Sequence, residues 1–205
     1  MYEEKAGDSR RNLIYKEAVR MIAERGFAAT SVRDICKAVG IKESSFYIYF
    51  SKKEEILSEV FSEFEALFLK APVSDEQIAS LTDEFSPRRI LVEALSLCFG
   101  RLRDESVRRL WRVVIVEQFC DERAACALRS VNRRLAETAG GLFAQWRRRG
   151  FLDNPEAVVP AAEFFAASVR MLFYDCLSRG GGTPPPEEIE RLAAFFLSVL
   201  KVRFV

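Results

Sequence analysis

The chain of 205 residues is 49% hydrophobic and 30% charged, with a formal net charge of +1. This composition excludes an intrinsically disordered chain and gives no overall positive charge that would by itself indicate nucleic-acid binding. The sequence has no histidine, which excludes Ser-His-Asp and Cys-His catalysis and imidazole-bound metal sites. It also has no Gly-rich phosphate loop and no acidic cluster with metal-ligand spacing, so we expect neither an enzyme nor a cofactor or metal.

Two further properties of the composition concern the compartment. No apolar run approaches the roughly 18 residues that a membrane-spanning helix needs, so we expect a cytoplasmic protein without a membrane partner. The cysteines show no CxxC pairing, which favours buried free thiols over a redox sensor at Cys120 or Cys126. The five cysteines are Cys36, Cys98, Cys120, Cys126 and Cys176.

The first predicted helix follows a polar arm over residues 1–8. Asp8 or Ser9 can cap this helix, which continues through Arg25, and Gly26 ends it. Its buried side is predicted to consist of Leu13, Ile14, Ala18 and Ile22.

The next stretch is typical of two short helices with a tight joint. Ser31 and Asp34 have the spacing of a capping box, after which apolar residues recur at helical spacing until Gly40 provides a stop. A second short helix, 42–47, turns Phe46 inward and its polar side chains outward, and Ser51 caps the helix that follows. This pattern predicts a helix-turn-helix over about residues 31–50, whose second helix is small enough to enter a major groove.

These residues resemble a known family. The ordered set that carries the resemblance is Ile14, Ala18, Ile22, Gly26-Phe27, Thr30-Ser31-Val32, Ile35, Ala38, Gly40-Ile41, Phe46-Tyr47, Tyr49-Phe50, Lys53-Glu54 and Leu57. In this order and without a gap, it is similar to the DNA-binding domain of the TetR family of transcriptional regulators. The resemblance implies an all-α fold with a DNA-binding head over residues 8–68 and a helical ligand-binding and dimerisation body over residues 69–205.

The resemblance also implies which residues meet DNA. A helix N-terminus at Thr30 and Ser31 can bind a phosphate, and residues 42–45 form the exposed turn of the recognition helix. Glu43, where a basic or neutral residue is more usual, either accepts from a cytosine amine or repels DNA. The resemblance implies that Tyr47 and Tyr49 contact the DNA backbone. The alternative is that their rings pack in the protein core. The full candidate set is Thr30, Ser31, Lys42, Glu43, Ser44, Ser45, Tyr47, Tyr49 and Lys53.

The remainder of the chain is predicted to be helical. Apolar periodicity and breakers place helices over 52–70, 75–82, 87–103, 105–119, 122–149, 154–177 and 187–202. The last two are too apolar to be one-sided surface helices, so a partner should cover them. In the resembling family the last two helices pair two subunits, which implies a homodimer through about 155–177 and 187–202.

Aromatic residues are frequent in the body, where the family surrounds an effector cavity. The residues expected to line it are Phe64, Phe68, Phe99, Trp111, Gln118, Phe119, Phe143, Trp146, Phe165 and Tyr174, with Glu117 and Asp175 as further polar groups. The sequence thus predicts a regulator that binds a pseudo-palindromic double-stranded operator and is released from it by a small, largely apolar ligand. The alternatives are an activator or partner-regulated member of the same family, and, more remotely, a helical enzyme or carrier with a vestigial head.

Overall fold

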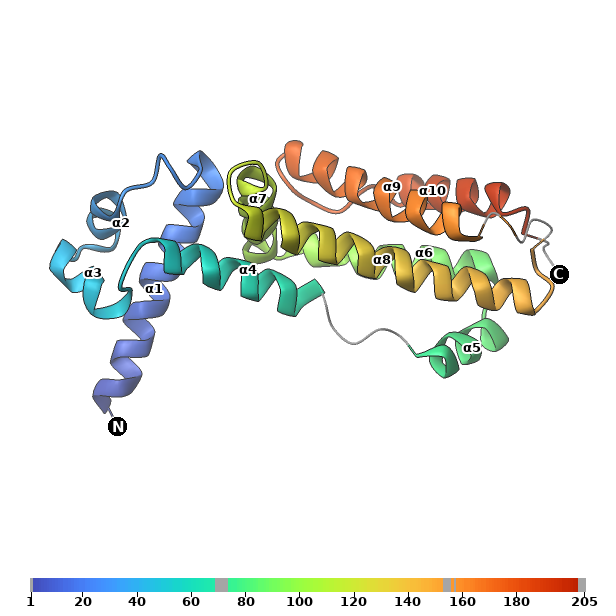
Figure 1. The fold of residues 1–205 in the computed structure, drawn as a ribbon, viewed down its shortest axis with the longest axis horizontal. Coiled ribbons are helices and arrows are strands. Elements are labelled where there is room, and N and C mark those ends of the chain that lie inside the picture. The colour runs from blue at the N-terminus through green and yellow to red at the C-terminus, as the bar shows by residue number, and fades with distance from the viewer. Residues whose placement is uncertain (1, 69–73, 153–155, 157, 203–205) are drawn as a thin grey trace. The chain divides into compact units, whose positions relative to one another are not determined.

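The computed structural model describes residues 2–68, 74–152, 156 and 158–202 (Figure 1). Its elements are α1 (Tyr2–Arg25), α2 (Val32–Val39), α3 (Glu43–Tyr49), α4 (Glu54–Phe68), α5 (Asp75–Glu84), α6 (Pro87–Gly100), the 3₁₀ turn η1 (Arg101–Arg103), α7 (Glu105–Glu117), α8 (Glu122–Arg148), α9 (Val158–Ser178) and α10 (Pro186–Val199). An isolated bridge between Leu152 and Val202 is the only β-type pairing in these ranges. The predicted all-α fold is therefore confirmed. None of the helices described is both long enough and apolar enough to cross a bilayer.

The chain divides into two compact units. The first unit comprises residues 1–68 and 106–128, and the second comprises residues 69–105 and 129–205. The first unit therefore holds α1 to α4 together with α7 and the beginning of α8. The functional division into a head and a body at residue 68 stays a prediction.

The first helix differs from its prediction in its start and in one buried position. Its backbone is helical from Tyr2, so the polar arm predicted over residues 1–8 is wrong for residues 2–8. No proline interrupts this segment, and once a helix has nucleated each added residue gains a hydrogen bond. Ile14, Ala18 and Ile22 are fully buried as predicted, whereas Leu13 is 52% exposed because it lies one position around the helix from the buried stripe.

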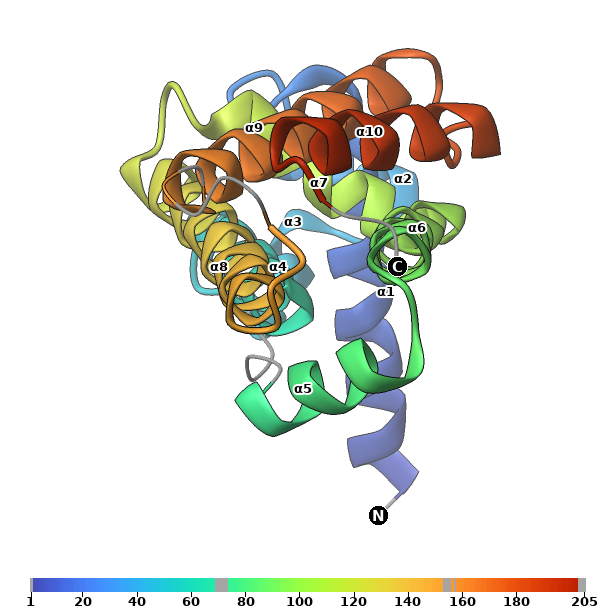
Figure 2. The ribbon, with the colours of Figure 1, turned by 90° about the vertical axis from the view of Figure 1, so that its right-hand side faces the viewer.

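The core of the second unit is built where small and aromatic residues alternate. α8 and α9 approach closely, since a Cβ on Gly140 would lie 3.7 Å from that of Ala162. Phe165 fills the adjoining space, with ring centroids 6.0 Å from Phe143 and 4.9 Å from Phe196. α10 packs against α6 and α9, and α9 and α10 lie side by side (Figure 2). These two helices therefore form one continuous face of the second unit.

Several helix ends differ from the prediction. α7 ends at Glu117, which leaves Phe119 in the following turn with 86% of its surface exposed. Ser51 does not cap α4, which begins at Glu54; instead its backbone N–H donates to the Glu55 carboxylate at 3.0 Å. The predicted end of this helix at residue 70, the stop at Ala71-Pro72 and the helix start at Asn154-Pro155 lie outside the described residues.

The cysteines fall into two classes. Cys36 and Cys176 are buried and Cys98 is half-buried, and burial raises the pKa of all three thiols, that of Cys98 to about 11. Cys120 and Cys126 are exposed, so the expectation of buried thiols is wrong for these two. Cys120 lies in the turn that begins when α7 ends, and Cys126 lies on an outward position of α8.

This difference predicts the outcome of thiol labelling. Under native conditions a thiol-reactive probe is expected to modify Cys120 and Cys126 rapidly, and Cys36, Cys98 and Cys176 only after denaturation, because the thiolate must be both formed and reachable. Mass spectrometry of tryptic peptides would assign each modified site. Fast modification of all five cysteines in the folded protein would contradict the burial described here.

Candidate nucleic-acid interface

The helix-turn-helix begins with the predicted capping box. The Asp34 N–H donates to Ser31 Oγ at 3.1 Å, and the Ser31 N–H donates back to the Asp34 carboxylate at 3.3 Å. Hydrogen bonds from the Ser31 hydroxyl and N–H hold the pKa of Asp34 below its usual range, because they favour the ionised carboxylate. At the other end of α2, Gly40 has φ 70°, a left-handed conformation that glycine adopts without strain. The chain therefore turns sharply from α2 into α3.

Buried side chains fix α3 against the rest of the head. Phe46 is fully buried and Phe50 is 1% exposed, and their rings stack with centroids 5.5 Å apart. On α2, Ile35 and Cys36 are buried as well. α3 is thus anchored from its inner side, and its outer side is exposed.

The outer side of α3 carries most of the predicted DNA contacts. Glu43 and Ser44 are exposed, as is Lys42 just before the helix, and Tyr47 is 55% exposed with its ring edge against Phe46. Ser45 and Tyr49 are half-buried, so they reach the surface at the sides of the helix. Residues 42–49 are therefore brought together on one short element. The sequence prediction did not include the most exposed apolar side chain of this element, Ile48.

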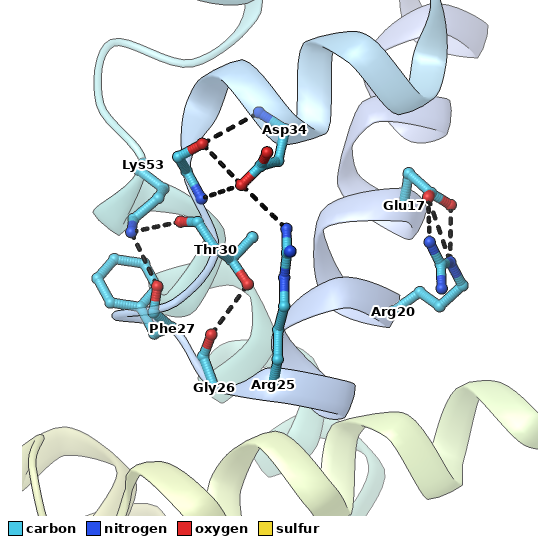
Figure 3. Close-up of polar contacts among 9 residues, drawn as sticks. Glu17, Arg20, Arg25, Gly26, Phe27, Thr30, Asp34 and Lys53 are labelled. Atoms are coloured by element: carbon cyan, nitrogen blue, oxygen red, sulfur yellow. Dashed lines mark hydrogen bonds and ion pairs between the residues drawn. The ribbon is translucent and has the colours of Figure 1, made fainter.

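The side chains of Thr30 and Ser31, by contrast, form hydrogen bonds within the protein. Thr30 is fully buried, and its hydroxyl donates to the carbonyl of Gly26 at 2.9 Å (Figure 3). Ser31 is exposed, and its hydroxyl both accepts from the Asp34 N–H and donates to the Asp34 carboxylate at 2.8 Å. Arg25 reaches the same carboxylate at 3.1 Å. The side chain of Thr30 stabilises the turn from inside, while Ser31 stays at the surface.

Lys53 has a structural role that its position in the motif did not indicate. Its ammonium group donates to the carbonyls of Phe27 and Thr30 at 2.9 and 2.7 Å, and it stands 3.8 Å from the centroid of the Phe27 ring (Figure 3). Partial burial lowers the pKa of this amine. An ammonium group has three N–H donors, and these two carbonyls accept from two of them. Lys53 thereby ties the start of α4 to the loop between α1 and α2.

The same loop is held from α7. Glu117 is 7% exposed and accepts a hydrogen bond from the backbone N–H of Phe27 at 2.9 Å. From the sequence, Glu117 was predicted to be a polar group of the effector cavity. Its contact with Phe27 could not be predicted, because the two residues lie 90 positions apart in the sequence. Glu117 is therefore a positioning residue for the loop that precedes α2.

Removing this acceptor has a predictable cost. Glu117→Ala is expected to lower the free energy of unfolding of the first unit by about 1–3 kcal/mol, because it leaves a part-buried N–H without its acceptor. Glu117→Gln retains a carbonyl oxygen at the same place and is expected to cost clearly less. Urea unfolding of both variants, with hydrogen exchange at the Phe27 amide, would compare them. Equal stability of the alanine variant and the parent would contradict the role given to Glu117.

The residues predicted for an effector cavity lie in two groups. In the first unit, Phe64, Phe68 and Trp111 form one aromatic cluster with centroids 4.8 to 5.2 Å apart. Gln118 is half-buried and donates to the carbonyl of Ile115 at 2.8 Å, while Phe119 is exposed.

In the second unit, Phe143 lies next to both Trp146 and Phe165, and Phe99 stacks obliquely on Phe173 with centroids 4.6 Å apart. Tyr174 is half-buried. Within the described residues no group of three or more Cys, Asp or Glu side chains is arranged to hold a metal ion.

Comparison with known proteins agrees with this geometry. The profile of the bacterial regulatory proteins of the tetR family matches residues 14–60, the stretch from α1 into α4. The HTH-type transcriptional repressor KstR2 of Mycolicibacterium smegmatis is 43% identical over 56 residues, which are 27% of this chain and 27% of that protein. The aligned stretch thus spans about a quarter of the length of this curated relative.

Solved structures extend the likeness to the whole fold. NalD of Pseudomonas aeruginosa, the secondary repressor of the MexAB-OprM multidrug efflux pump, has a TM-score of 0.64 at 23% identity, covering 97% of this chain and 100% of that one. A transcriptional regulator from Saccharomonospora viridis, solved in complex with choline, has a TM-score of 0.64 at 19% identity, covering 93% and 96%. Residues 14–60 thus match the DNA-binding domain of the TetR family of transcriptional regulators, and over nearly its full length the chain has the fold of these solved regulators.

Proposed function

We propose that the protein is a repressor that binds a pseudo-palindromic operator as a homodimer and leaves it when a small, largely apolar effector binds the body. The observation that carries this proposal is the polarity of α3, which is buried at Phe46 and exposed at Glu43, Ser44 and Tyr47. A short helix anchored on one side and polar on the other suits insertion into a major groove. KstR2 and NalD, both named as repressors, support the direction of regulation.

The proposed interface uses the exposed members of the predicted set. Lys42, Ser44 and Ser45 donate to base edges or phosphates, and Glu43 accepts from a cytosine amine. Tyr47 and Tyr49 hydrogen-bond to the phosphate backbone on either side, and Ser31 lies at the N-terminus of α2, where a phosphate is favoured. Thr30 supports this surface from inside, and Lys53 supports it while offering its remaining N–H to a phosphate.

The proposed dimer forms through α9 and α10. Phe164 on α9 and Phe195 on α10 are 57% and 49% exposed with ring centroids 6.2 Å apart. They border an apolar groove of about 680 Å³ that also includes Met171, which is 59% exposed. An apolar face of this extent favours a second copy, since two-fold symmetry pairs it with itself. A dimer also supplies the two recognition helices that a palindrome requires.

The proposed effector acts by shifting a population. In one conformation of the dimer the two heads cannot span both half-sites of the operator. A ligand that binds this conformation more tightly than the DNA-binding one raises its population. Operator affinity then falls by at most the ratio of the ligand's affinities for the two conformations. The aromatic residues that the family resemblance assigns to the effector cavity favour a largely apolar ligand. The regulator solved with choline supports a small molecule, without indicating which one binds this chain.

The experiment that tests this function is a selection from duplexes with a random central region. We expect enrichment of an inverted repeat whose half-sites lie about one helical turn, or a multiple of it, apart. A reporter placed under the enriched sequence should rise when the gene for this protein is deleted; a fall would identify an activator instead. Absence of any enriched sequence would overturn operator recognition itself.

A further inference from the structure

Ile48 is the most exposed apolar side chain of the recognition helix. It is 77% exposed, compared with 55% for Tyr47, which also contacts the Phe46 ring. A single exposed aliphatic residue on a protein surface needs no explanation. Ile48 differs because it lies on the element whose outer face is proposed to enter DNA, among polar neighbours.

Helix geometry directs Ile48 straight outward. Successive residues of an α-helix are rotated by about 100°, so positions two before and two after Phe46 lie about 160–200° around the axis from it. These positions are Ser44 and Ile48, and both are exposed while Phe46 is fully buried. Because they are four residues apart, their side chains form one stripe along the helix. Ser44 and Ile48 are therefore the outermost pair on α3.

The chemistry of the side chain limits what it can contact in the groove. Ile48 has no donor or acceptor, so it cannot bind the polar edges of guanine, cytosine or adenine. The apolar group that the major groove presents is the C5-methyl of thymine. We propose that Ile48 is a specificity-determining residue that packs on a thymine methyl in each half-site, with Ser44 hydrogen-bonding next to it. This inference rests on the proposed function, because it requires α3 to lie in the major groove.

The test removes the methyl group from DNA and the aliphatic group from the protein. An operator is first selected from the random duplexes, and each of its thymines is then replaced, in both half-sites together, by deoxyuridine, which pairs identically but lacks the methyl. At one symmetric pair of thymines the parent protein is expected to lose about 4-fold in affinity per half-site, or about 15-fold for both. Ile48→Ser should bind thymine and deoxyuridine duplexes equally and lose a similar factor on the thymine duplex.

A matched variant controls for removing exposed apolar surface from the head. Leu13→Ser changes a side chain that is 52% exposed on α1 and should keep the full thymine preference. If a sequence is enriched but no thymine-to-deoxyuridine change matters, or if Ile48→Ser keeps the preference of the parent, the role of Ile48 is overturned while operator binding stands. If no sequence is enriched, the proposed function and this inference both fail.

Discussion

Replacing Phe164 by glutamate is expected to convert the dimer to a monomer at micromolar concentration and to weaken operator binding by about 100-fold or more. Phe164 is 57% exposed in the single chain and stands beside the similarly accessible ring of Phe195. In the proposed dimer this side chain becomes buried, where an unpaired carboxylate is strongly disfavoured. Separate subunits must then bind each half-site independently. The increase in operator affinity that comes from linking the two heads is lost.

Sedimentation velocity would measure the mass, and titration of the selected operator would measure the affinity. The matched control is Leu97→Glu, which introduces the same charge on α6 at a side chain that is 74% exposed. This control should leave both mass and affinity unchanged. A Phe164→Glu variant that remains a dimer with full affinity would rule out α9 and α10 as the interface.

Replacing Lys53 by methionine is expected to lower the free energy of unfolding by about 3 kcal/mol, since each hydrogen bond from a charged group contributes about 1.5–3 kcal/mol. Methionine keeps an apolar stem over the Phe27 ring but leaves the carbonyls of Phe27 and Thr30 without their donor. DNA affinity should fall for all sequences alike. The slope of log affinity against log salt concentration should become shallower by about one, because in the proposed interface Lys53 neutralises one phosphate and methionine cannot.

Chemical denaturation and salt titrations separate the two roles of Lys53. Lys52→Met serves as the control, because it removes the same charge from an exposed neighbouring side chain and should leave stability nearly unchanged. A fall in affinity at a single base position, with stability intact, would show that Lys53 reads a base and does not tie the loop.

The features that the sequence predicted well are local. The capping box of Ser31 and Asp34, the turn at Gly40 and the inward Phe46 each depend on residues within four positions of one another, and all three are confirmed. Such short-range patterns are read directly from spacing, because backbone geometry converts spacing into direction. The helices of the second half were predicted for the same reason.

The features that the sequence did not predict depend on tertiary contacts or on exact helix ends. Glu117 meets the Phe27 amide across 90 residues, and Lys53 turns its ammonium toward two carbonyls that no motif identifies. Phe119 and Cys120 continue the apolar pattern of α7 in sequence, yet the helix ends at Glu117 and leaves both on the surface. Hydrophobic periodicity does not fix the exact end of a helix. Here the position of that end decides whether Phe119 and Cys120 are buried or exposed.

The measurement that tests the central claim most directly is an equilibrium titration of the selected duplex beside a scrambled duplex of equal length, at several salt concentrations, with the mass of the complex determined. We predict two subunits per selected duplex and a preference of about 10³-fold or more over the scrambled duplex, retained as both affinities fall with salt. Equal, weak binding to both duplexes, or one subunit per selected duplex, would contradict operator recognition by a dimer.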